Sequence, residues 1–106
     1  MKDDRTAAGG LKALGHPIRL QIVRTLAERS CCCCGDVCGG LPLAQSTVSQ
    51  HLKVLRDADL VRVRRDGVRS SYVLNTSAIA ELRLKLEEIA SLAQSHAAAS
   101  PAGEVR

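Results

Sequence analysis

All five cysteines of this 106-residue chain lie within eight consecutive positions, at Cys31 to Cys34 and Cys38. Thiols this close together oxidise, exchange disulfides or bind soft metal ions unless the fold restrains them. They are a poor disulfide framework, because five is an odd number and bonds between adjacent residues close no useful loop. The spacing therefore indicates a segment that senses or binds something.

The residues after the cysteine run could order some of these thiols. Asp36 is placed to begin a short helix, since its carboxylate can accept backbone N–H groups and complement the helix dipole. The glycines and the proline within residues 39–42 would end that helix. Cys34 and Cys38 are four residues apart, so they share one face if the turn is helical. The positive end of a helix also favours the thiolate form of cysteine.

Other interpretations of the thiols compete with metal capture. A cysteine is often a small buried apolar residue without reactivity. A structural zinc(II) site or a redox-sensing thiol would use the same residues. A small thiol enzyme fits less well, because no Cys-x-x-Cys in a βαβ setting, acid–base pair or phosphate loop accompanies the run. We therefore expect a protein that is not an enzyme.

The composition predicts one small aliphatic domain. Hydrophobic residues make up 45% of the chain, without Trp or Phe and with a single Tyr, and such a core gains stability from dimerisation. A formal net charge of +4 suits a polyanionic partner. No run of about 18 apolar residues marks a membrane span, and the N-terminus lacks the apolar core of a signal peptide. We therefore expect a cytoplasmic protein with reduced thiols and no membrane partner.

Two helices are predicted before the cysteine run. Residues 6–14 form a short helix, and the polar residues 1–6 are expected to be frayed. The next helix begins at Pro17, because proline suits the first helical position. His16 is expected to cap this helix or pack against it, and Arg19 to occupy an exposed position. The apolar residues recur at helical spacing and should be buried: Ile18, Ile22 and Leu26.

The helix after the run has an apolar and a polar face. It spans residues 45–58 and could begin with Thr47-x-x-Gln50 as a capping box. Two helices joined by a tight turn, the second polar on its outer face, describe a helix-turn-helix. Asp59 follows at the helix C-terminus, where aspartate tolerates a left-handed backbone. The expected inward stripe consists of Val48, Leu52 and Leu55.

An arginine-rich β-hairpin is predicted next. Residues 60–65 and 70–74 have strand patterns, and Asp66-Gly67 between them is a tight-turn signal. Six basic and three acidic residues between positions 45 and 74 give a local charge of +3, most of the total. A hairpin of this kind after a helix-turn-helix is a wing that would meet DNA. Its arginines are expected on the exposed face and the tip: Arg62, Arg64, Arg65 and Arg69.

A last helix is predicted from Thr76 or Ser77 to about Ser95. The expected fold is thus mainly α with a β-hairpin wing, a dimeric winged helix-turn-helix of order α-α-α-α-β-β-α over residues 1–96. Residues 97–106 are expected to form a disordered tail. The apolar residues of the last helix are spaced three and four apart, a seam that suits a partner helix: Ile79, Leu82, Leu86, Ile89 and Ala93.

Together these residues resemble the ArsR/SmtB family of winged-helix metalloregulatory repressors. The likeness is carried by Leu-Gly-His-Pro-Ile-Arg-Leu at residues 14–20, Leu-Ala-Gln-Ser-Thr-Val-Ser-Gln-His-Leu-Lys-Val-Leu at 43–55 and Ala-Asp-Leu-Val at 58–61. It covers roughly residues 10–95. The resemblance implies a homodimer, built through the first and last helices, that covers double-stranded operator DNA and leaves it when an inducer binds.

The resemblance also implies which thiols bind the inducer. Members that detect arsenic(III), antimony(III) or cadmium(II) often carry a Cys-x-Cys-Asp-Leu-Cys motif at the start of the third helix. Aligned on Asp36, Cys33 and Cys38 match the outer cysteines, whereas Gly35 replaces the middle one. Cys34 is the natural substitute, and As(III) prefers three thiolates. We expect As(III) or Sb(III), or else Cd(II) or Zn(II), and no obligatory cofactor. The expected ligands are Cys33, Cys34 and Cys38, with Cys31 and Cys32 as alternatives.

DNA contacts are expected from the outward face of the 45–58 helix and from the wing. Groove contacts are assigned to Gln45, Ser46, Thr47, Ser49 and Gln50. Phosphate or minor-groove contacts are assigned to Lys53, Arg64, Arg65 and Arg69. His51 belongs to the same helix, where a DNA-facing role and a structural role are both open.

Overall fold

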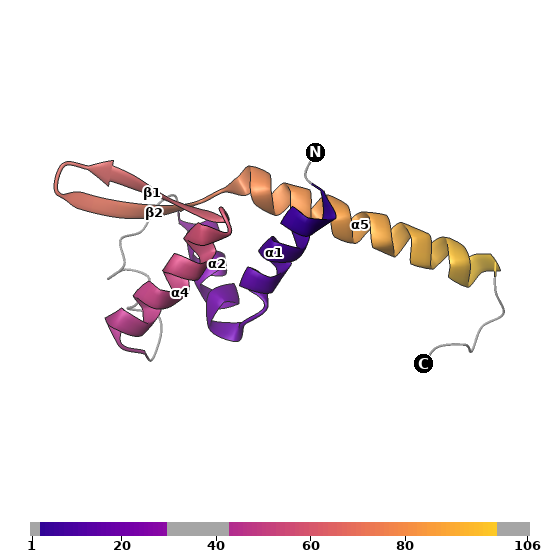
Figure 1. Cartoon of the computed structure of the whole chain (residues 1–106), viewed down its shortest axis with the longest axis horizontal. Helices are drawn as coiled ribbons and strands as arrows, with labels where there is room; N and C mark the ends of the chain where they lie inside the picture. Colours follow the sequence, from indigo (N-terminus) through magenta and orange to yellow (C-terminus); the bar gives the residue numbers. More distant parts are fainter. Residues whose placement is uncertain (1–2, 30–42, 100–106) are drawn as a thin grey trace.

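The computed structural model describes residues 3–29 and 43–99. Its elements are α1 (Asp4–Leu14), α2 (Pro17–Glu28), α4 (Gln45–Asp57), β1 (Val61–Asp66), β2 (Arg69–Leu74) and α5 (Thr76–Ala99). The hairpin and the outer half of α5 extend from the helical body in opposite directions (Figure 1). The predicted mainly α fold with one hairpin is confirmed for this part of the chain. The short helix expected at Asp36 and the whole cysteine run lie outside the described residues.

Side-chain caps define the starts of the first two helices. The Asp3 carboxylate accepts a hydrogen bond from the Thr6 N–H at 3.0 Å. Helix α1 therefore begins at Asp4, within the segment that we expected to be frayed, because the cap satisfies a backbone donor that the helix leaves unpaired. Nδ1 of His16 accepts from the N–H of Ile18 at 3.0 Å, and Pro17 occupies the first turn of α2. The capping role predicted for His16 is confirmed.

Helix α4 starts without the predicted capping box. Its N-cap residue is Ala44, which offers no side-chain hydrogen bond. Thr47 is the third residue of the helix, and its N–H donates to the Ala44 carbonyl at 3.1 Å. The capping-box prediction was wrong because the helix begins two residues before Thr47. At the other end Asp59 has a φ of 60°, which confirms the predicted left-handed position.

An aliphatic core holds the helices and the base of the hairpin together. The predicted stripe of α4, Val48, Leu52 and Leu55, is fully buried. It packs with Ile22 and Leu26 of α2, with Leu60 and Val61 at the entry to β1, and with Leu82 of α5. This buried stripe fixes how α4 is rotated about its axis, so its opposite face must point to solvent.

The two strands of the hairpin each extend one residue closer to the turn than the sequence pattern predicted. Val61 pairs with Leu74 at its base and Asp66 with Arg69 at its end. The two-residue loop is therefore Gly67-Val68, not Asp66-Gly67. Gly67 adopts a φ of 67°, which glycine accepts without a steric penalty.

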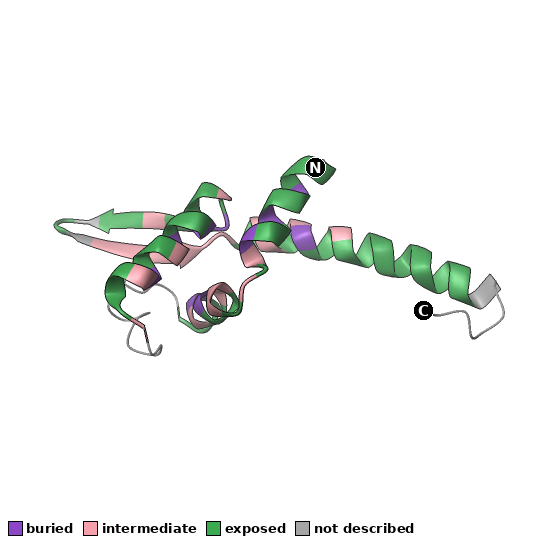
Figure 2. Cartoon of the chain, turned by 60° about the horizontal axis from the view of Figure 1, so that its bottom comes forward, coloured by how far each residue is buried: buried purple, intermediate pink, exposed green. Residues whose placement is uncertain are grey.

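Helix α5 is longer than predicted and only partly covered. It runs to Ala99, past the predicted end near Ser95 and into the expected disordered tail, because alanine has the highest helix propensity. Within the predicted seam Leu82 is buried, but Leu86 and Ile89 are 52% and 60% exposed. Figure 2 shows the exposed outer half of α5. No helix in residues 3–29 or 43–99 is long and apolar enough to cross a membrane.

Candidate DNA-binding site

The solvent face of α4 gathers most of the residues predicted to contact a DNA groove. Because Val48, Leu52 and Leu55 are buried, residues on the opposite side of the helix are presented together. The exposed polar residues are Gln45, Ser46, Ser49, Gln50 and Lys53. Thr47 is only half-buried within the first turn and lies toward the edge of this face. The face offers hydroxyls and amides that can hydrogen-bond base edges.

His51 turns toward the body of the protein. Its ring centroid lies 4.6 Å from that of His16, and its Nδ1 lies 3.4 Å from Nη1 of Arg19. Burial lowers the pKa of His51, and the charges of His16 and Arg19 lower it further. Of the two roles that the sequence leaves open for His51, this packing favours the structural one.

Arg19 is a structural residue that the sequence pattern misplaced. We expected it to be exposed, but it is half-buried, and its Nε donates to the Ala13 carbonyl at 2.6 Å. Ala13 belongs to the last turn of α1, where carbonyls have no partner within the helix. The guanidinium therefore ties the end of α1 to α2 and to α4. Its helical position alone carried no signal for these contacts.

Lys53 is available to a phosphate despite an ion pair. Its Nζ lies 3.1 Å from Oδ2 of Asp57, one turn later, and both side chains are about 70% exposed. Exposed pairs of this kind contribute little free energy, roughly 0–1 kcal/mol, and they are screened by salt. A phosphate can therefore displace Asp57 from Lys53 at small cost.

The wing arginines are divided between two faces of the hairpin. Successive residues of a strand point to opposite sides, so Arg65 lies on the same side as Val61 and Val63, and Arg64 lies on the side of Arg62. The prediction that these arginines are exposed is confirmed for Arg62, Arg64 and Arg65, although they lie on two faces of the hairpin. Arg64 and Arg65 are both exposed near the tip, and the register places Arg69 opposite Asp66, next to the loop.

Arg62 belongs to the base of the wing. Its Nε and Nη2 donate to the two carboxylate oxygens of Asp59 at 3.2 and 3.3 Å. This fork explains the raised pKa of Arg62, to which the hydrogen bond to Asp59 contributes most. The arginines predicted to contact DNA lie farther along the hairpin, nearer the tip.

The predicted metal ligands cannot be placed in the same way. Cys33, Cys34 and Cys38, and the alternatives Cys31 and Cys32, all lie outside the described residues. Within residues 3–29 and 43–99, no group of three or more His, Cys, Asp or Glu side chains could hold a metal ion.

The fold and the exposed polar face of α4 beside an arginine-tipped hairpin define a winged-helix DNA-binding protein. Residues 16–63 match the family model of the bacterial regulatory protein, arsR family. A transcriptional regulator of Methanocaldococcus jannaschii is 32% identical over 89 residues, which are 84% of this chain and 100% of that protein. The chain belongs to the arsR family and is a DNA-binding transcriptional regulator, not an enzyme.

Two further comparisons concern function and fold. The arsenical resistance operon repressor of Staphylococcus xylosus is 38% identical over 65 residues, 61% of this chain and 62% of that protein. An ArsR-like transcriptional regulator from Rhodococcus has a TM-score of 0.77 at 22% identity, covering 90% of this chain and 89% of that one. This likeness confirms the winged-helix fold.

Proposed function

We propose that this regulator is a dimeric repressor that leaves its operator when a thiophilic metalloid or metal ion binds the cysteine run. The observation that carries the proposal is the grouping of five thiols within residues 31–38, shortly before α4 begins at Gln45. The similarity of this chain to an arsenical resistance operon repressor supports As(III) or Sb(III) as the inducer. Soft thiolates would also accept Cd(II) or Zn(II).

The operator contacts follow from the exposed face of α4 and from the wing. Side chains near the start of α4 would read base edges in the major groove, namely Gln45, Ser46, Thr47, Ser49 and Gln50. Cationic groups beyond them would contact phosphates or the minor groove, namely Lys53, Arg64, Arg65 and Arg69. Together they cover one half-site of a two-fold symmetric operator.

The inducer would act through the segment that precedes α4. Cys33, Cys34 and Cys38 are the proposed ligands, with Cys31 and Cys32 as alternatives. Drawing three thiolates around one ion would change the path of the chain that enters α4. An ion lowers DNA affinity to the extent that it binds the free conformation more tightly than the DNA-bound one.

The dimer is proposed from the uncovered apolar surface of α1 and α5. A groove between the two helices is lined by Ala8, Leu11, Ile89 and Leu92, among others. Ile89 and Leu92 are 60% and 66% exposed, and Leu86 lies on the same helix at 52%. Leucine and isoleucine side chains at this spacing form helix–helix seams. A second copy of the chain would cover them and set two α4 helices side by side on DNA.

The decisive experiment titrates a protein–operator complex with arsenite, antimonite, cadmium, zinc and peroxide. We expect release by a soft ion, and loss of that response in Cys33→Ser, Cys34→Ser and Cys38→Ser but not in Cys31→Ser or Cys32→Ser. Failure of every ion to release DNA would refute metalloid sensing. Release by peroxide alone, reversed by reductant, would instead assign a redox sensor. Zinc that stays bound to the protein while the protein remains on DNA would indicate a structural zinc site.

A further inference from the structure

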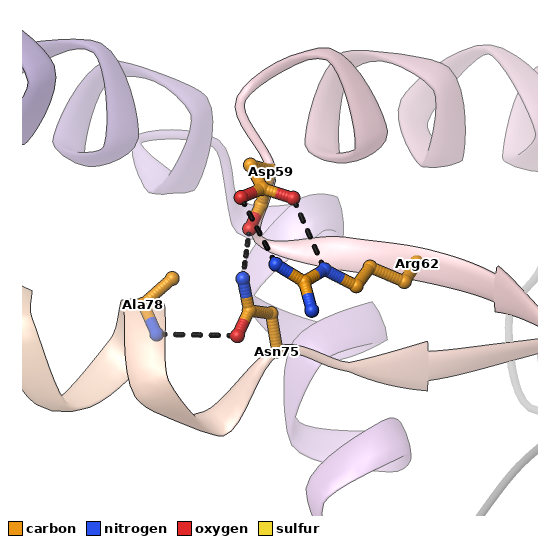
Figure 3. Close-up of polar contacts among 4 residues, drawn as sticks. All are labelled: Asp59, Arg62, Asn75 and Ala78. Atoms are coloured by element: carbon orange, nitrogen blue, oxygen red, sulfur yellow. Dashed lines mark hydrogen bonds and ion pairs between the residues drawn. The ribbon is translucent and has the colours of Figure 1, made fainter.

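The side chain of Asn75 connects the turn after α4 to the start of α5. Asn75 stands between the end of β2 at Leu74 and the start of α5 at Thr76. Its Nδ2 donates to the backbone carbonyl of Asp59 at 2.7 Å (Figure 3). Its own N–H donates to the carbonyl of Leu60 at 2.9 Å. Two hydrogen bonds therefore hold the turn that leaves α4 against the residue that opens α5.

The same side chain caps α5. Oδ1 of Asn75 accepts from the N–H of Ala78 at 3.4 Å (Figure 3). The Asn75 carbonyl accepts from the N–H groups of Ala78 and Ile79 at 3.1 and 3.2 Å. Asparagine is favoured at such N-caps because its oxygen satisfies a donor that the helix leaves unpaired. One amide group thus serves two elements, with its oxygen turned to α5 and its nitrogen to the turn after α4.

Packing alone leaves room at this junction. A cavity of about 50 Å³ lies between α1, the turn at residues 58–60 and α5. Gly10 and Ala78 are among its small lining residues, and Leu82 closes part of it. Where side chains do not fill the space, apolar contacts constrain the angle between two elements less tightly. The hydrogen bonds of Asn75 therefore carry much of that constraint.

We propose that Asn75 is a positioning residue that sets the angle of α4 relative to α5 and thereby selects the spacing between operator half-sites. The inference rests on the proposed dimeric operator binding. In a dimer joined through α5, the separation of the two α4 helices depends on the α4–α5 angle in each protomer. Dimeric helix-turn-helix proteins need that separation to match about one turn of DNA, roughly 34 Å. Asn75 lies at the pivot between the helix that reads DNA and the helix that pairs.

The test uses a duplex that the parent protein selects from random double-stranded DNA, its derivatives with the half-sites one or two base pairs closer or farther apart, and a duplex with one half-site. Asn75→Asp keeps an oxygen for the Ala78 N–H but removes the donor to Asp59, whereas Asn75→Ala removes both. Arg62→Ala is the matched control, because it breaks the side-chain pair with Asp59 and leaves the backbone carbonyl bonded to Asn75.

We expect both Asn75 variants to bind the single half-site within about twofold of the parent. On the two-half-site duplex they should bind about tenfold more weakly, and their preference among spacings should flatten, because each protomer loses one orienting hydrogen bond. Arg62→Ala should keep the spacing preference of the parent. Thermal melting of each variant reports whether the fold itself is affected.

Two results would overturn the inference while leaving the proposed function intact. One is a spacing profile of Asn75→Asp that matches that of the parent. The other is an equal loss on single and double half-sites, which would assign Asn75 to fold stability alone. A parent that sediments as a monomer on and off DNA, or that selects a single site, would instead refute the proposed dimeric repressor, and the inference would fall with it.

Discussion

Nη1 of Arg19 lies 3.4 Å from Nδ1 of His51 and joins α2 to the helix that faces DNA. A guanidinium can only donate, so Nδ1 of His51 must accept and the ring proton must reside on Nε2. The contact therefore requires the neutral imidazole. Protonation of His51 would oppose two positive groups at the base of α4 and break this contact.

Stability should consequently fall as the pH is lowered. The pKa of His51 is below its ordinary value of 6.5, first because of burial and then because of His16 and Arg19. Between the folded and the unfolded pKa the unfolded chain binds more protons, so the free energy of unfolding decreases with decreasing pH. The contribution of His51 is complete above pH 6.5 and is lost as the pH falls through the folded pKa.

Urea denaturation of the parent and of His51→Asn between pH 5 and pH 8 measures this effect. The asparagine oxygen can accept from Arg19 without titrating, so the variant should show a shallower pH dependence. Equal slopes for His51→Asn and the parent would show that the contact does not depend on the neutral ring.

Two adjacent glycines of α1 should respond differently to alanine. A Cβ on Gly9 would have no atom within 4 Å, so Gly9→Ala should raise the free energy of unfolding by about 0.5–1 kcal/mol through the unfolded-state entropy. A Cβ on Gly10 would lie 3.1 and 3.2 Å from the methyl carbons of Leu82. Gly10→Ala should therefore be less stable than Gly9→Ala by about 1 kcal/mol. An equal increase in the free energy of unfolding for both variants, measured by urea denaturation, would mean that α1 and α5 can move apart to make room for the added methyl group.

The left-handed residue after α4 should discriminate between glycine and alanine. Asp59 has a φ of 60°, a conformation that costs an alanine about 1–2 kcal/mol. Asp59→Ala should lose about that much stability, whereas Asp59→Gly should stay within about 0.5 kcal/mol, since the lost pair with Arg62 is exposed and weak. An Asp59→Ala variant as stable as Asp59→Gly would show that the turn relaxes to another conformation.

The two wing arginines on opposite faces should both contribute to DNA binding. If the hairpin enters a groove of the DNA, its two faces lie against the two DNA strands. Arg64→Ala and Arg65→Ala should then each reduce the slope of log affinity against log salt concentration by about one. Arg83→Ala on α5 is the control, because Arg83 is ion-paired with Glu87 away from the wing. Binding titrations over a range of salt concentrations measure the slope. A decrease for only one arginine would mean that the wing lies flat on the DNA.

The apolar seam on α5 should govern dimerisation. Leu86→Ser and Ile89→Ser each remove a leucine or isoleucine that is more than half exposed in one chain. Each should therefore weaken self-association by at least about tenfold in sedimentation equilibrium while leaving the monomer folded. Leu84→Ser is the matched control, because Leu84 is 50% exposed but lies on another side of the helix. An equal effect at Leu84 would contradict the proposed seam.

Local patterns were sufficient to predict several features. The apolar spacing of α4 predicted the burial of Val48, Leu52 and Leu55, because a helix repeats its faces every three to four residues. The cap at His16 and the left-handed position of Asp59 followed from residue types that favour those conformations. The start of α4 at Gln45 was also predicted, but its capping box was not found, because the N-cap residue is Ala44, which has no side-chain hydrogen-bonding group.

The contacts that orient the DNA-facing helix depend on residues far apart in the chain. Arg19 and His51 are separated by 32 positions, and Asn75 and Asp59 by 16. No periodicity or turn signal links such pairs, because they meet only after the core has packed α2 and α5 against α4. The division of Arg64 and Arg65 between two faces, by contrast, follows from the alternation of side chains along any strand. Only their cross-strand partners, Ser71 and Ser70, depend on the register.

The sequence by itself determined the class of this protein, since its apolar spacing, its caps and its turn residues act within a few positions of each other. It also supplied the cysteine run on which the proposed inducer site depends. Only the tertiary structure decided that His51 and Arg19 face inward, that Asn75 joins α4 to α5 and that the seam of α5 stays uncovered. Those outcomes depend on which surfaces the packed core leaves exposed, and that is a property of the whole fold.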